Sequence, residues 1–222
     1  KQLMNTLYLV EFRFFLLPVL MQVFFAIITL FISYQAFKVF RITKHPQSKS
    51  MSAAFFLIFI SYVVQATINF LNVMKINPDI YVVFGIHPLS VFHNQGLYFH
   101  ILFMTFGLAF LMFTVFKSKE SSLLWYFVLT SVLVFFLSSN KLIGFFMLTV
   151  LYLAFLSYHY MLNYKKRKKI GPLLVALAFV SMLIGHLGFL FLTKSTLFYA
   201  IGHSFSFVGY LLLLVNYHII KK

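Results

Sequence analysis

The sequence predicts an all-α membrane protein, a bundle of seven transmembrane helices with the N-terminus outside and the C-terminus in the cytoplasm. Of its 222 residues, 62% are hydrophobic and 9% are charged, whereas soluble chains are about half apolar and a quarter charged. The apolar residues form seven runs, and the links on one side hold most of the basic residues. Because disorder needs low hydrophobicity, the same composition excludes a disordered chain.

Each span follows from the length of an apolar run, since a bilayer core of ~30 Å needs about 20 residues of helix. In chain order the predicted spans are 18–40, 51–74, 96–116, 123–137, 142–163, 172–192 and 197–220. Pro18 and Pro172 stand at predicted first turns, where the missing N–H costs nothing. We therefore expect one transmembrane domain over 18–222, preceded by an outer interfacial segment over 1–17 that is too short to span.

The basic residues set the orientation. Five of the 18 Lys and Arg belong to one side: Lys1, Arg13, Lys75, Lys141 and Lys194. The other thirteen lie around the links after spans one, three and five and at the C-terminus, among them the run 165–169. The richer side is expected to be cytoplasmic, which makes this a multi-pass protein of the cytoplasmic (plasma) membrane.

The net charge of +15 does not indicate nucleic-acid binding. The run 165–169 is predicted to rest on anionic lipid headgroups, and no aromatic-interleaved basic surface accompanies it. The expected surroundings are therefore the lipid bilayer and either a membrane-protein partner or further copies of this chain. The link 75–95 is the longest and contains Pro, Gly and an apolar stretch, so it is predicted to cover the outer mouth as a lid.

Costly polar residues inside the spans indicate the site, since such residues usually face the bundle interior or a cavity. His93, Gly96, His100 and Gly107 recur at helical spacing, which predicts an inward face with close helix approach. His186 lies six residues before its outer end and His203 six residues after one, about 9 Å deep. Three histidines from three helices are thus predicted to occupy one layer of the outer leaflet.

Small-ligand binding or sensing in a polar outer cavity is the first function that this layer indicates. The predicted binding residues are Gln22, Gln65, Asn69, Asn72, His100, His186, His203 and Tyr210. A hydrogen-bonded network that only specifies helix packing is the structural alternative.

A haem b-binding electron-transfer subunit is the second function that these histidines indicate. His100 with His186 or His203 would hold an outer haem, and His159 with His218 an inner one, because bis-His ligation needs two facing imidazoles in an aromatic pocket.

A metal-dependent membrane enzyme is the third, with His100, His186 and His203 as ligands of a divalent metal. The catalytic signatures Gly-x-Ser-x-Gly and His-Glu-x-x-His are absent from the sequence, as is cysteine. We therefore expect binding in preference to catalysis.

Overall fold

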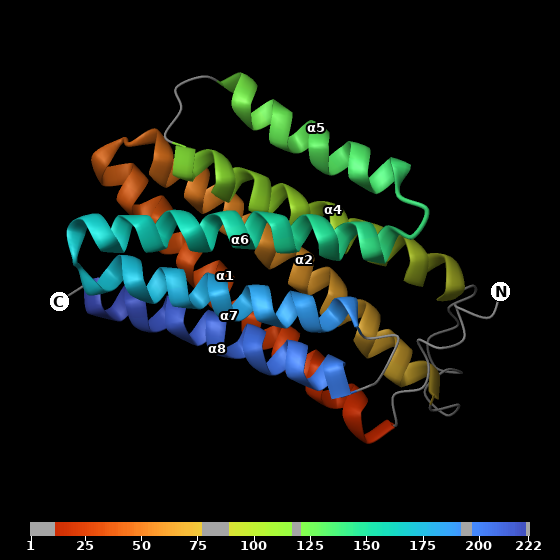
Figure 1. Ribbon diagram of the computed structural model, residues 1–222. Coiled ribbons are helices and arrows are strands. Elements are labelled where there is room, and N and C mark those ends of the chain that lie inside the picture. The colour runs from red at the N-terminus through yellow and green to blue at the C-terminus, as the bar shows by residue number, and fades with distance from the viewer. Residues whose placement is uncertain (1–11, 77–88, 117–120, 192–196, 221–222) are drawn as a thin grey trace.

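The computed structural model describes residues 12–76, 89–116, 121–191 and 197–220, and all regular secondary structure in these ranges is helical. The helices are α1 (Phe12–Thr43), α2 (Pro46–Ile76), α4 (Leu89–Phe116), α5 (Ser121–Leu137), α6 (Lys141–Arg167), α7 (Ile170–Leu190) and α8 (Leu197–Ile220). They lie side by side as an elongated bundle (Figure 1). The predicted all-α class is confirmed, and the described residues form the seven helices that were predicted.

Six of the helices are long and apolar enough to cross a membrane, namely all except α5. With 17 residues, α5 rises about 25 Å, less than the ~30 Å core. The prediction of seven spans is therefore supported for six helices.

The six long helices close a ring. Going round it, α1 packs on α2, α2 on α4, α4 on α6, α6 on α7, α7 on α8, and α8 again on α1. In the described part of the chain, α5 packs only on α4 and α6, and it lies along one edge of the bundle (Figure 1). The interior of this ring is therefore enclosed without α5.

Small residues bring the helices of the ring together. A Cβ on Gly107 of α4 would lie 2.9 Å from the carbonyl oxygen of Ala54 on α2, and one on Gly185 of α7 would lie 2.7 Å from that of Gly202 on α8. Larger side chains would not permit either approach. Of the inward face predicted for span three, Gly107 lies at this contact and His100 is buried, while the side chain of His93 lies outside the described residues.

Helix ends differ from the prediction mainly at the N-terminal side. The stretch of α1 that is apolar and long enough to cross a membrane begins at Pro18, as predicted. The helix itself begins at Phe12, so the prediction that Pro18 stands in the first turn was wrong, and the proline removes one backbone hydrogen bond inside α1. Of the expected interfacial segment, residues 1–11 lie outside the described residues. The link 75–95, which was predicted to be a lid, is shorter at both ends because α2 and α4 extend into it. Its middle, 77–88, also lies outside the described residues.

The basic run predicted to lie on lipid is at the turn from α6 to α7. α6 ends at Arg167, and Lys168 reverses the chain with a left-handed φ of 53°. Asn140 caps the other end of α6, where its side chain accepts hydrogen bonds from the backbone N–H groups of Leu142 and Ile143.

Candidate functional site

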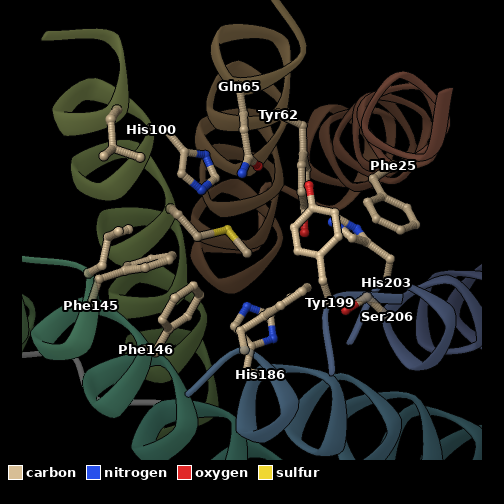
Figure 2. A pocket seen from close by; sticks show the side chains of 14 residues that line it. Phe25, Tyr62, Gln65, His100, Phe145, Phe146, His186, Tyr199, His203 and Ser206 are labelled. Carbon is tan, nitrogen blue, oxygen red and sulfur yellow. The ribbon is translucent and has the colours of Figure 1, made fainter. Parts of the chain in front are cut away.

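A cavity of about 80 Å³ lies inside the ring, and each of the six ring helices contributes to its wall. It is toward the end where α4, α6 and α8 begin, away from the basic turn between α6 and α7. Figure 2 shows its lining side chains converging from the surrounding helices. The lining residues are Phe25, Tyr62, Gln65, Leu97, His100, Met104, Leu142, Phe145, Phe146, His186, Phe189, Tyr199, His203 and Ser206.

The three histidines predicted to share one layer all line this cavity. Their exposed fractions are 5% for His100, 5% for His186 and 8% for His203. They come from three helices, α4, α7 and α8, in which their positions in the sequence predicted similar depths.

His100 is fixed by Ser61 of α2. Its Nδ1 lies 2.7 Å from the Ser61 hydroxyl and 3.1 Å from the Ser61 carbonyl oxygen, while that hydroxyl donates to the His100 carbonyl at 3.0 Å. A carbonyl oxygen only accepts, so Nδ1 carries the proton. In the neutral imidazole Nε2 is then an acceptor, and it has no hydrogen-bond partner among the described residues.

His186 also carries its proton on Nδ1, but it donates to a different partner. Its Nδ1 donates to the carbonyl oxygen of Met182, one turn earlier in α7, at 2.9 Å. The ring is held edge-on against Phe146 and Phe189, with centroids 6.3 and 5.7 Å away. Its Nε2 is likewise an acceptor without a partner in the described part of the chain.

His203 packs against aromatic rings. Its ring lies edge-on to Tyr199, at 4.5 Å between centroids, and to Phe189, at 5.1 Å. Its buried Nδ1 has no hydrogen-bond partner within the described residues. An unmade bond of this kind costs about 1–3 kcal/mol.

An aromatic cluster closes the cavity toward the basic end. The Tyr210 hydroxyl donates to the Tyr62 hydroxyl at 2.9 Å. The ring of Phe25 packs on both tyrosines, at 5.3 Å from Tyr62 and 4.8 Å from Tyr210. Tyr62 faces the cavity, and Tyr210, which was predicted to bind ligand, lies behind it.

The remaining predicted residues divide between the wall and the layer behind it. Gln65 lines the cavity, whereas Gln22 and Asn69 are absent from its lining and pair with each other, the Asn69 amide donating to the Gln22 side-chain oxygen at 2.9 Å. Gln22 is fully buried, and its Nε2 has no partner in the described chain. Asn72 is in α2, but its side chain lies outside the description.

Several wall residues were missed by the prediction. Ser206 and Tyr62 carry a signal in the sequence, since each lies three residues from a predicted member, His203 and Gln65. The wall phenylalanines carry none, because the chain has 32 Phe.

The predicted metal site is not supported, because no group of three or more His, Asp or Glu that could hold a metal is present among the described residues. A haem does not fit either: the cavity of about 80 Å³ is far below the ~300–1,000 Å³ of pockets for drug-sized ligands. The predicted inner haem pair is not supported, since His218 is exposed at the bundle surface and α7 lies between α6 and α8.

No protein-family model matches the chain, and no curated protein and no solved structure matches it. The geometry of the cavity is therefore the basis for any functional argument.

Proposed function

We propose that this protein binds or senses a small molecule in the histidine-lined cavity, without catalysing a reaction. The observation that carries the proposal is the convergence of His100, His186 and His203 on one cavity, with the Nε2 atoms of the first two left as acceptors. Among the atoms of the three rings, His203 Nδ1 is buried without a hydrogen-bond partner in the described part of the chain, and a buried polar group in that state is costly. A ligand or ordered water that bonds to this atom would offset that cost, and the same molecule can donate to the two Nε2 atoms.

The incomplete hydrogen bonding favours binding over helix packing as the role of these residues. Four buried polar atoms have no hydrogen-bond partner among the described residues, and two of them, His203 Nδ1 and Gln22 Nε2, belong to the predicted binding set. The others are Thr149 Oγ1 and Asn216 Oδ1. A network that existed only to specify packing would be expected to satisfy its own members.

We place the cavity in the outer half of a protein of the cytoplasmic membrane, with the N-terminus outside and the C-terminus inside. The support is the bias of basic residues toward the opposite end of the bundle. The chain has no cysteine, so a membrane-impermeant maleimide can report single introduced cysteines. In intact cells the exposed Ser139→Cys should react and the exposed Lys166→Cys should not; the reverse pattern would invert the orientation.

Sensing would require the bound ligand to bias helix positions at the cytoplasmic end. α8 is the helix best placed for this, because it carries His203 and Ser206 on the cavity and runs to the C-terminal end of the bundle.

A thermal-shift screen of the detergent-purified chain tests the binding proposal. The library should contain neutral, cationic and anionic small molecules and divalent metals. A true ligand at 100 times its dissociation constant adds about 2.7 kcal/mol of stability. This gain should be lost in His186→Phe, which keeps the ring and removes its nitrogens, and kept in His218→Phe, which alters an exposed histidine.

If no compound stabilises the wild type in a way that depends on His186, the proposal is wrong. A visible spectrum of the same sample tests the haem alternative. We expect no Soret band, and a band that disappears in His186→Phe would favour haem instead.

A further inference from the structure

We infer that the ligand of this cavity is a compact, uncharged, planar molecule with at least two N–H donors and one acceptor, of the carboxamide and urea class. The inference rests on the proposed binding function and adds the chemistry of the ligand. It follows from which polar atoms of the wall still have a bond to make.

Three polar groups of the wall, on three helices, present acceptors to the cavity. The Nδ1–H groups of His100 and His186 already donate hydrogen bonds to backbone carbonyls, so both Nε2 atoms remain as acceptors. Ser206 donates its hydroxyl proton to the carbonyl of Gly202 at 2.9 Å, so its oxygen also presents lone pairs. A ligand facing these groups must supply donors.

The wall also carries donors, since Gln65 brings an amide N–H group, His203 a ring N–H and Tyr62 a hydroxyl. The Tyr62 oxygen accepts the proton of Tyr210, so the O–H of Tyr62 itself remains available to the cavity. Figure 2 shows Tyr62 reaching into the space from α2, with His186 rising from α7 on another side. A carbonyl group could accept from Tyr62 while N–H groups of the same molecule donate to the imidazoles.

The wall favours a neutral and flat molecule. None of the residues that line the cavity is charged, and an ion without a partner is very costly in such surroundings. Phe145 and Phe146 of α6 and Phe189 of α7 present rings to the space, against which a planar group can pack.

The volume of the cavity limits the size of the ligand. About 80 Å³ is roughly half of the ~150 Å³ apolar cavity that holds a benzene molecule. The space therefore suits about three or four non-hydrogen atoms. The ceiling on affinity per atom limits a four-atom ligand to a dissociation constant of about 40 µM or weaker.

Four probes of the same shape test this chemistry: acetamide, acetone, acetate and acetamidinium. Each has four non-hydrogen atoms in a plane and a methyl group, whose protons report binding to the full chain in detergent by saturation-transfer NMR. We expect acetamide to bind at millimolar concentration or tighter. Acetone, which lacks the N–H donors, should bind at least tenfold more weakly, and the two ions should bind more weakly than acetamide.

Two variants locate the binding. His186→Phe should weaken acetamide at least fivefold and leave acetone unchanged, while the exposed His218→Phe should leave both unchanged. Should His186→Phe fail to fold, Tyr62→Phe gives the matching test from the carbonyl side, again with a loss for acetamide.

Equal binding of acetone and acetamide would overturn the inferred donors, and tighter binding of either ion would overturn the inferred neutrality. Absence of acetamide binding up to about 100 mM, more than three orders above the affinity ceiling, would overturn the inferred class. The proposed function would survive that result if the thermal-shift screen gives a ligand whose effect depends on His186. It would fail with the inference if the screen gives none.

Discussion

The contact between α7 and α8 gives the sharpest prediction about stability, through Gly185→Ala. A Cβ on Gly185 would lie 2.7 Å from the backbone oxygen of Gly202 and 2.8 Å from the Ser206 hydroxyl. A backbone oxygen cannot rotate away, so the helices must separate. Ordinary contact begins at 3.4 Å, which requires a shift of about 0.7 Å between them.

The magnitude follows from the packing that this shift removes. A radial gap of about 0.5–1 Å forfeits a quarter to a half of the dispersion energy between facing atoms, and forced overpacking costs about 1–3 kcal/mol. Alanine returns about 1 kcal/mol through its higher helix propensity. Because a rigid backbone atom is hit, we expect the upper part of the range, a net loss of about 2 kcal/mol.

Gly188→Ala is the matched control one turn away on the same helix. Its Cβ would meet the Phe198 carbonyl at 3.3 Å, so a few tenths of an ångström relieve it. We expect a stability within about 0.5 kcal/mol of the wild type, or slightly higher. Reversible unfolding in SDS-containing mixed micelles, followed by circular dichroism, measures both variants. Equal midpoints for Gly185→Ala and Gly188→Ala would refute the packing argument.

Three further predictions concern single hydrogen bonds. Tyr210→Phe should lower the free energy of unfolding by about 0.6–2 kcal/mol, and a double-mutant cycle with Tyr62→Phe should return a similar coupling energy, whereas additive effects would mean that the bond contributes nothing. Asn140→Ala should cost about 1 kcal/mol, because it removes the N-cap of α6; Asn140→Asp should keep most of that stability. Ser61→Ala removes the hydroxyl beside His100 Nδ1 and keeps the backbone carbonyl that accepts from it, so ¹⁵N NMR of the imidazole should show Nδ1–H in the variant as in the wild type, whereas Nε2–H in the wild type would mean that the hydroxyl donates to Nδ1.

Much of the fold could be predicted because the bilayer imposes simple rules on the sequence. An apolar run of about 20 residues is a helix in a membrane, and a polar residue inside it must face protein. These rules predicted the seven helices and the convergence of His100, His186 and His203. The start of α1 was missed because a proline predicts the first turn of a helix, whereas Pro18 is the seventh residue of α1.

The arrangement of the helices round the ring could not be predicted in the same way. Nothing in the sequence says that α4 packs on α6 and leaves α5 outside, since phenylalanine lies on most faces of most helices. For the same reason the sequence could not show which of the predicted polar residues line the cavity and which lie behind it. Gln22, Gln65 and Asn69 have suitable depths, but only the rotation of α1 against α2 decides that Gln65 lines the cavity while the others pair behind it.

The bundle contains its own comparison for judging what the histidines do. Where α1 meets α2, the Ser33 hydroxyl donates to the Ser52 carbonyl at 2.9 Å and the Ser52 hydroxyl donates to the Ser33 carbonyl at 3.0 Å. This contact is reciprocal, closed and without unused protons, as expected of polar residues that only join helices.

The cavity differs from that contact in a consistent direction. The Nδ1–H groups of His100 and His186 donate to backbone carbonyls and so fix the two rings. The lone pair of each Nε2 atom remains available at the cavity. Joining helices would need no cavity and no unused acceptor, and Ser33 and Ser52 show that this chain can make such a joint. Fixed rings with free Nε2 atoms around a cavity are what a preorganised binding site requires, and for this reason we assign them to a ligand.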